Sequence, residues 1–208
     1  IFVFTGLTAW GFFLETVTGG TGSIVANSGL VKKVYLPREI FPLSTLGTSS
    51  VNSAIQLVIL LGAIVVTGAI PSLAQLAYLP LALVVLVVYA TLFALLLSAL
   101  NVYMRDIQHL IEVITFLAFW ASPIVYSYSY VQKALAVNYP VAHEIYLANP
   151  VTLAILGFQR SLWAAGIDQP YPVHLMIRLA VAALIGIVLI FGAHRVFARL
   201  EGNFAQEL

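Results

Sequence analysis

The chain contains no Asp, Glu, Lys or Arg between Glu39 and Arg105. A helix needs about 20 apolar residues to cross the hydrocarbon core of a bilayer, so this stretch is too long for one span and suits two. Pro71 lies near its middle and marks a turn. The stretch therefore predicts an antiparallel pair of transmembrane helices, 51–70 and 76–100, joined by a short uncharged connection.

The composition of the whole chain is typical of a membrane protein. Hydrophobic residues make up 62% of the sequence and charged residues only 8%, whereas roughly a quarter of the residues in soluble domains are charged. Three further segments, 1–22, 110–128 and 174–197, are long and apolar enough to span. We expect an all-α integral membrane protein, a single transmembrane domain over 1–208, with five visible transmembrane helices.

Residues 27–43 form the charged island between these apolar runs. Because charged side chains are costly in hydrocarbon, the segment should lie at the membrane surface. Val31, Val34 and Tyr35 would share one face of a short amphipathic helix. The segment thus predicts a compact, stiff elbow, which is either an ordinary loop or an element that docks a soluble partner. The basic residues Lys32, Lys33 and Arg38 would cluster off that face. Pro37 and Pro42 should limit how far any helix can run.

The first apolar segment, 1–22, has one charged residue, Glu15, within the membrane or near its edge. A carboxylate there could bind a substrate hydroxyl, hold a partner helix or relay protons, and the sequence leaves these roles open. The small and hydroxyl residues of the segment favour close packing against other helices: Thr5, Gly6, Thr8, Gly11, Thr16, Thr18, Gly19 and Gly20. A polar face at the start of the next span should point at protein or water: Ser44, Thr48, Ser49, Asn52, Ser53 and Gln56.

The longest connection covers residues 131–173. Its stretch 151–165 is mostly apolar yet too short to span, which is typical of a re-entrant or interfacial segment. We expect two short helices that dip toward the membrane, hinged near Pro140 and Pro150; an ordinary extracytoplasmic fragment is the alternative. In the preceding span, Pro123 should kink the helix near an interfacial aromatic belt of Trp120, Tyr126, Tyr128 and Tyr130.

The basic residues predict the orientation in the membrane. Under the five-span arrangement one side holds Lys32, Lys33, Arg38, Arg105, Arg195 and Arg199, and the other holds Lys133, Arg160 and Arg178. The positive-inside rule then places the elbow and the carboxyl terminus in the cytoplasm. Because Ile1 begins within an apolar stretch, we expect a further helix upstream, which makes six in the intact chain.

Several kinds of chemistry are missing from the sequence. It has no Gly-x-x-x-x-Gly-Lys-Ser/Thr segment, so any ATP dependence must come from another polypeptide. It has no cysteine, which excludes disulfides, thiolate metal sites and cysteine nucleophiles. The four histidines show no metal-ligand spacing, so we expect no metal site. The net charge is +1 with scattered basic residues, which argues against nucleic-acid binding.

Separate motifs follow one another along nearly the whole chain: FTGLTAWGFF at 4–13, LVKKVYLPREIFPLS at 30–44, NVYMRD at 101–106, SPI at 122–124, NP at 149–150 and FARLEGNFAQEL at 197–208. In this order they resemble the permease subunit of ATP-binding-cassette (ABC) polysaccharide exporters. That family exports O-antigens, capsules, teichoic acids and related lipid-linked glycans.

The resemblance implies a six-helix permease in a bacterial or archaeal cytoplasmic membrane. It would form a homodimer and pair with two ATPase subunits, which bind ATP and Mg, while this chain binds no cofactor. The elbow would dock into the ATPase through Lys32, Lys33, Tyr35, Leu36, Pro37, Arg38, Glu39 and Phe41. The short helices of the last outer loop would line the exit of the channel, with Pro150, Phe158 and Arg160 as its outer gate.

A path for a glycan needs groups that bind each sugar weakly, and aromatic faces beside polar tips suit this purpose. Candidates for its lining are Trp10, Phe13, Glu15, Phe116, Trp120 and Tyr126. Core packing and interface anchoring are the alternative roles of these aromatic residues.

The sequence and the resemblance together predict an ATP-driven exporter of lipid-linked polysaccharide, in which the ATPase moves the elbow. One alternative is a drug or small-lipid exporter of the same superfamily. Another is a proton-coupled carrier that uses Glu15, although the inverted repeat found in many such carriers is not visible.

Overall fold

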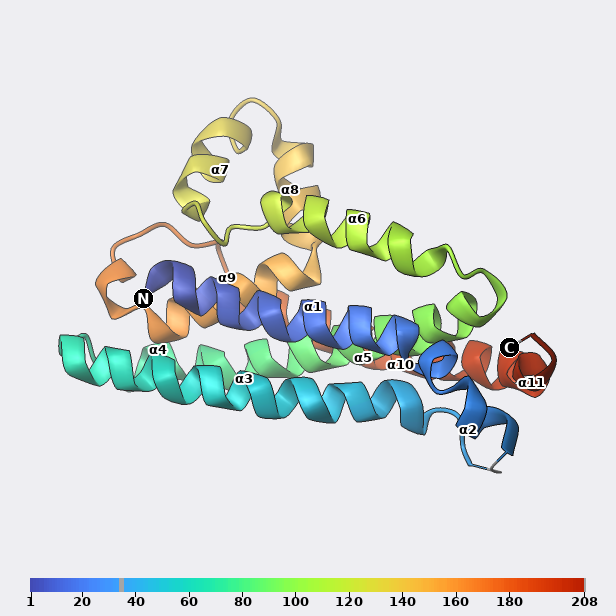
Figure 1. Ribbon diagram of the computed structural model, residues 1–208. Helices are drawn as coiled ribbons and strands as arrows, with labels where there is room; N and C mark the ends of the chain where they lie inside the picture. Colours follow the sequence, from blue (N-terminus) through green and yellow to red (C-terminus); the bar gives the residue numbers. More distant parts are fainter. Residues whose placement is uncertain (34–35, 208) are drawn as a thin grey trace.

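The computed structural model describes residues 1–33 and 36–207, which form helices, turns and connections without a β-strand (Figure 1). Long helices run side by side along one direction, and α7 and α8 project from this bundle. The elements are α1 (Phe2–Ala26), α2 (Ser28–Lys33), α3 (Ile40–Thr67), α4 (Leu73–Leu76), α5 (Tyr78–Tyr103), α6 (Ile107–Ala121), α7 (Tyr128–Leu135), α8 (Pro140–Ala148), α9 (Pro150–Leu162), η1 (Ala164–Gly166), α10 (Leu175–Leu200), η2 (Glu201–Asn203) and α11 (Phe204–Glu207).

Helix α5 is the centre of the bundle, since it contacts α1, α3, α9 and α10. Glycines let three of these neighbours approach its backbone closely. A Cβ atom on Gly20 of α1 would lie 2.6 Å from the Cβ of Ala94, and one on Gly157 of α9 would lie 2.7 Å from the Cβ of Ala82. A Cβ on Gly186 of α10 would meet Val88 at 2.5 Å. Small residues at helix crossings allow this close packing in membrane proteins.

Helix α1 packs against protein along much of its length, which confirms the prediction from its small and hydroxyl residues. Thr5, Thr8 and Thr16 are fully buried. The Thr5 and Thr8 hydroxyls donate to the carbonyls of Ile1 and Phe4, both at 2.9 Å, so these polar groups are satisfied within the helix.

Three helical stretches are long and apolar enough to cross a membrane: Ile40–Thr67, Leu73–Tyr103 and Leu175–Asn203. The pair Pro140–Ala148 and Pro150–Leu162 would add a fourth as one broken span, bent by 80°. Helix α1 does not meet the same conditions, and α6, with 15 residues, is shorter than a typical span. The chain is thus a multi-helix membrane protein with three to four candidate spans, and five visible spans remain a prediction.

Two predictions about prolines were wrong. Pro123 does not kink a span: α6 ends at Ala121, and Ser122 is extended with ψ 149°, as the residue before a proline usually is. Pro42 does not limit the elbow, because it lies in the first turn of α3, where a backbone N–H has no helical partner to lose. Pro140 and Pro150, in contrast, are the first residues of α8 and α9, where a hinge was expected.

Candidate functional site

The elbow between α1 and α3 has an exposed tip and a buried base. Lys32, Lys33 and Pro37 are exposed, and Leu36 exposes 45% of its surface. Arg38 and Glu39 are half-buried, and Phe41 is buried. Of the predicted elbow residues, Tyr35 lies outside the described residues, as does Val34. The exposed tip presents two cations and an apolar side chain to whatever lies beyond it.

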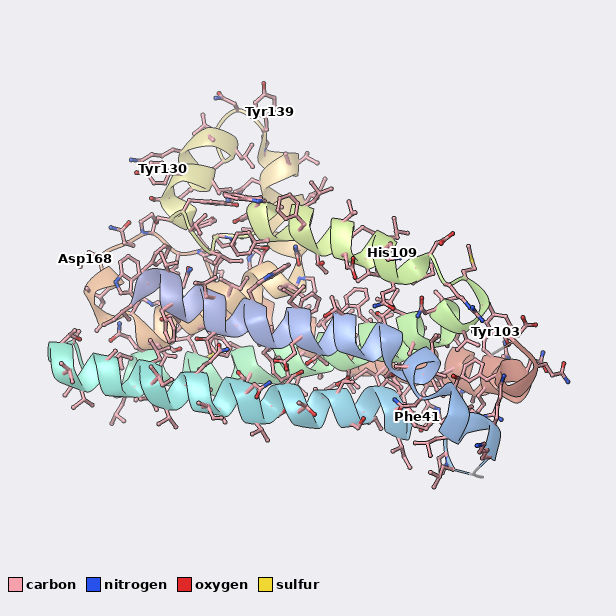
Figure 2. All side chains as sticks on the ribbon, viewed as in Figure 1. Phe41, Tyr103, His109, Tyr130, Tyr139 and Asp168 are labelled. Carbon is pink, nitrogen blue, oxygen red and sulfur yellow. The ribbon has the colours of Figure 1, made fainter. Side chains whose placement is uncertain are left out.

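The base of the elbow belongs to a small hydrophobic cluster that is separate from the main core, which we call the elbow core. It brings α1, α2, α3, α5 and α10 together with the carboxyl-terminal segment. Figure 2 shows Phe41 and Tyr103 at this end of the molecule. The buried members are Ile24, Val31, Phe41, Leu95, Ala99, Val102, Phe197 and Phe204.

Phe204 places the carboxyl-terminal segment in the elbow core. Its side chain is fully buried, and its ring meets that of Phe197 edge to face with centroids 5.6 Å apart. The Arg38 guanidinium lies 5.8 Å from the centroid of the same ring, a cation–π distance. The Tyr103 hydroxyl donates to the Leu200 carbonyl at 2.8 Å. The segment therefore contacts the elbow directly. Phe204 is the one aromatic residue in the sequence 198–208, and this was the signal that could have indicated a buried contact.

A polar contact also ties the elbow to α10. His194 Nε2 lies 2.8 Å from Glu39 Oε1, and the pair is an ion pair when His194 is protonated. Glu39 immediately precedes α3. The elbow is thus joined to α3 through the chain and to α10 through this contact and the elbow core.

The predicted lining residues fall into two groups. Trp10 and Phe13 of α1 are buried in the main core, where Trp10 packs on Phe119 at 5.9 Å and Phe13 on Phe93 at 6.1 Å between centroids. They have the core-packing role that was the alternative. Phe116 and Trp120 of α6 are 64% and 57% exposed, and Tyr126 is half-buried beyond the end of that helix.

Glu15 contacts the neighbouring helix. Its Oε1 accepts a hydrogen bond of 2.6 Å from Asn52 Nδ2 on α3. Among the roles left open by the sequence, this geometry corresponds to holding a partner helix. Asn52 belongs to the predicted polar face, of which Ser49 is buried.

The predicted outer-gate residues lie on α9 but differ in their surroundings. Pro150 is the first residue of α9, and Asn149 caps the helix by accepting from the Val151 amide at 3.0 Å. Phe158 is 1% exposed and belongs to the main core. Arg160 is half-exposed, donates from Nη1 to the Ile167 carbonyl at 3.0 Å, and lies 4.9 Å from the centroid of the Tyr171 ring.

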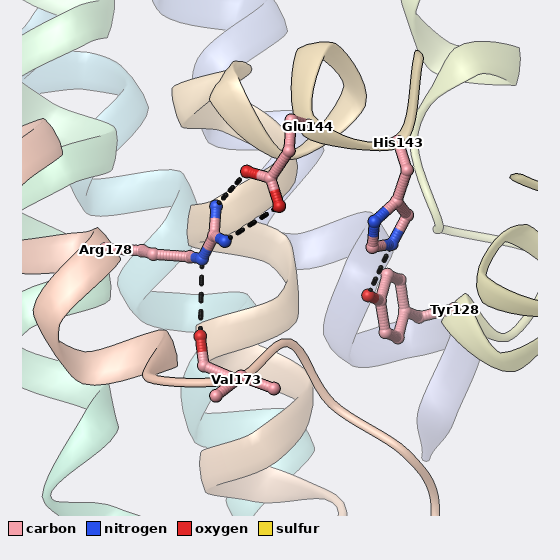
Figure 3. Close-up of polar contacts among 5 residues, drawn as sticks. All are labelled: Tyr128, His143, Glu144, Val173 and Arg178. Atoms are coloured by element: carbon pink, nitrogen blue, oxygen red, sulfur yellow. Dashed lines mark hydrogen bonds and ion pairs between the residues drawn. The ribbon is translucent and has the colours of Figure 1, made fainter. Parts of the chain in front are cut away.

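Helix α8 is held in place by polar contacts that the sequence did not predict (Figure 3). Arg178 of α10 donates to both carboxylate oxygens of Glu144, at 2.9 and 3.1 Å, and its Nε donates to the Val173 carbonyl at 3.3 Å. Beside this pair, the Tyr128 hydroxyl and His143 Nε2 are 2.8 Å apart. Helix α8 lies outside the three candidate spans, and the Arg178 hydrogen bonds hold the pKa of Glu144 below its ordinary value. Within residues 1–33 and 36–207, no three His, Asp or Glu side chains gather as metal ligands would.

These features define a multi-pass, all-helical membrane protein with a charged elbow between two long helices. Residues 1–163 match the family model described as ABC-2 type transporter. The chain belongs to the ABC-2 type transporter family, as the resemblance of its motifs predicted. Its members are transport permeases rather than enzymes, and membership implies an ABC ATPase as partner.

Two relatives show similarity over the full chain. An O-antigen export system permease protein RfbA from Klebsiella pneumoniae is 23% identical over 208 residues, which cover 100% of this chain and 75% of the relative. The protein of the same name from Myxococcus xanthus is 26% identical over 207 residues, which cover 100% of this chain and 75% of the relative.

Proposed function

We propose that this chain is the permease subunit of an ATP-driven exporter of lipid-linked polysaccharide. The observation that supports it most is the similarity to O-antigen export permeases over the whole chain, outer loop and carboxyl-terminal segment included. The sequence has no phosphate-binding loop of its own, which agrees with an energy source on a separate ATPase subunit that binds ATP and Mg. The assembly is a homodimer of six-helix permeases with two ATPases, and the elbow and carboxyl terminus lie in the cytoplasm.

In this proposal the elbow receives the movement of the ATPase. The exposed cations Lys32 and Lys33 and the apolar Leu36 form the contact. Phe41 and Arg38 lie against the elbow core, so displacement of the tip moves α1, α3 and α10 together. Close-packed aromatic clusters deform little, which suits an element that transmits a displacement.

The glycan path lies between the two permease copies, and the exposed face of α6 lines it. Phe116 and Trp120 present broad aromatic surfaces there and are the proposed sugar contacts. Trp10 and Phe13 support this wall from within the core. Helices α8 and α9 form the re-entrant outer loop that closes the far end of the path.

The elbow proposal is tested by replacing both Lys32 and Lys33 with alanine. Loss of two interface cations should weaken association with the ATPase and reduce export at least about tenfold. The measurement is co-purification of the ATPase together with glycan at the cell surface. A Lys133→Ala variant is the control, because Lys133 is an exposed cation on α7 at the opposite side of the proposed topology. Unchanged association and export in the double variant would overturn the role of the elbow.

The cargo is tested in cells that lack the protein. If the cargo is a lipid-linked glycan, that glycan should accumulate inside such cells. Accumulation of a drug or a small lipid instead, with normal surface glycan, would favour the alternative exporter. A carrier driven by protons would keep its activity without any ATPase and lose it in a Glu15→Gln variant; the contact of Glu15 with Asn52 favours a structural role.

A further inference from the structure

A cavity of about 570 Å³ opens where α9 ends and α5 and α10 begin. Its polar walls come from Tyr78, Arg160, Gln169, Tyr171 and His174, and the first turn of α10 supplies an apolar wall. This end of α10 lies far along the bundle from the elbow (Figure 1). We call it the α9–α10 cavity.

Arg160 brings a positive charge to the α9–α10 cavity. Its guanidinium is positioned by one hydrogen bond, to the Ile167 carbonyl at 3.0 Å, and by the Tyr171 ring 4.9 Å away. Neither partner is an anion. Within the part of the chain that the structure describes, no carboxylate oxygen, that of the nearby loop residue Asp168 included, lies within 4.0 Å of the guanidinium.

Arg178 shows the contrasting arrangement on the same side of the molecule. It donates to both oxygens of Glu144, so its charge is balanced. A guanidinium has five N–H donors in a fixed fork that matches carboxylate and phosphate oxygens. Arg160 therefore retains donors and a net charge that an anionic ligand in the cavity would satisfy.

Other wall residues add hydrogen-bond donors. Burial raises the pKa of Tyr171 to about 12, although the nearby Arg160 cation opposes this rise. Its phenol consequently stays protonated across the neutral pH range and can donate. Gln169 supplies an amide, and His174, at the start of α10, supplies an imidazole. Oxygen-rich anions such as phosphate bind to groups of donors of this kind.

An apolar surface leads away from the cavity along α10. Ile177, which lines the cavity, is 60% exposed. Val181, Leu184 and Val188 are 48%, 66% and 69% exposed. Their spacing places them with Ile177 on one face of the helix, and α10 is a candidate membrane span. A molecule that fits both features has an anionic head and a hydrocarbon tail.

We propose that the α9–α10 cavity binds the phosphate of an anionic lipid headgroup, with Arg160 as its principal contact and the acyl chains along α10. This site assigns Arg160 a role different from lining the channel exit. It is independent of the transported cargo, because it rests on the charge of the cavity and the apolar face of α10.

The experiment titrates the purified full chain in detergent micelles with phosphatidylglycerol, phosphatidylcholine or inorganic phosphate, and reads bound lipid by native mass spectrometry. Phosphatidylglycerol should bind at least about tenfold more tightly than phosphatidylcholine, whose choline neutralises its own phosphate. Arg160→Gln should remove this preference. Arg160→Lys should keep part of it, because the charge remains while the fork is lost. Lys133→Gln, which removes an outer-loop cation away from the cavity, should match the parent.

Three outcomes would overturn the proposal. An unchanged preference for phosphatidylglycerol in Arg160→Gln would show that the lipid binds elsewhere. An equal loss in Lys133→Gln would show that only the general charge of the outer loop matters. Displacement of the lipid by inorganic phosphate at a similar concentration would show a soluble-anion site. An unchanged thermal midpoint of the lipid-free Arg160→Gln protein excludes misfolding of this variant. If that midpoint falls, the Arg160→Lys variant tests the site in its place.

Discussion

The elbow end of the molecule and the opposite end, which carries α8 and the start of α10, are held together by different interactions. At the elbow end, Phe197 and Phe204 are fully buried and pack edge to face. At the other end, α8 is tied by the partly exposed pair of Glu144 and Arg178. Close-packed aromatic side chains resist deformation, whereas exposed ion pairs contribute little stability and exchange easily with water. We therefore expect the elbow core to be stiff and α8 to be held more loosely.

The largest effect is expected from Phe204→Ala. It removes a fully buried aromatic side chain from the elbow core, which typically costs about 3–5 kcal/mol. The elbow should become susceptible to proteolysis and the thermal midpoint of the purified protein should fall. Gln206→Ala, an exposed neighbour, should leave both unchanged. If the two variants behave alike, the carboxyl-terminal segment does not stiffen the elbow and the contrast between the ends disappears.

A smaller effect is expected where α9 crosses α5. Gly157→Ala would place a Cβ atom 2.7 Å from that of Ala82, and overpacking of this kind typically costs about 1–3 kcal/mol. The added Cβ of Gly62→Ala on α3 would meet no atom of the described residues within 4 Å, so this change should be neutral or stabilising by up to about 1 kcal/mol. Thermal midpoints of the two variants in the same detergent measure the difference. A stable Gly157→Ala protein would mean that α9 is as loosely held as α8.

The smallest effect is expected from the pH dependence of α8. The pKa of Glu144 is held below its ordinary value of 4.5 by the Arg178 hydrogen bonds, with a further contribution from His143. Since the folded-state pKa is lowered, the pair stabilises the docking of α8 above the ordinary value and loses this effect as the pH falls through the folded-state pKa. Because the intrinsic exchange rate of amides itself falls with pH, the quantity to compare is the protection factor, the intrinsic rate divided by the observed rate. The protection factors of 140–148 should fall on acidification, more than those of the elbow.

Glu144→Gln provides the matched control for this measurement. Its protection factors in 140–148 should be lower at neutral pH and should change less on acidification, because the titrating carboxyl is gone. An acid-induced fall in protection of the same size in this variant would assign the effect to another group, and the pair of Glu144 and Arg178 would then be irrelevant to how α8 is held.

Features carried by local sequence were predictable. The apolar composition indicated a membrane protein, the charged island indicated the elbow, and Pro140 and Pro150 indicated where α8 and α9 begin. Each depends on the chemistry of neighbouring residues along the chain, such as the cost of charge in hydrocarbon or the missing N–H of proline. The same local reasoning failed at Pro42, which lies in the first turn of α3, and at Pro123, which lies beyond the end of α6.

The sequence by itself determined that this chain is a multi-helix membrane protein with a charged elbow and no nucleotide-binding loop, because these properties follow from composition and spacing. Only the tertiary structure decided that Trp10 packs in the core and that Phe204 joins the elbow core. It also decided that Arg178 is paired with an acid, while Arg160 has no acidic partner among residues 1–33 and 36–207. The physical reason is that these environments arise from helices distant in sequence. Which side chains meet depends on how α5 arranges its neighbours, and that arrangement leaves no periodic signal along the chain.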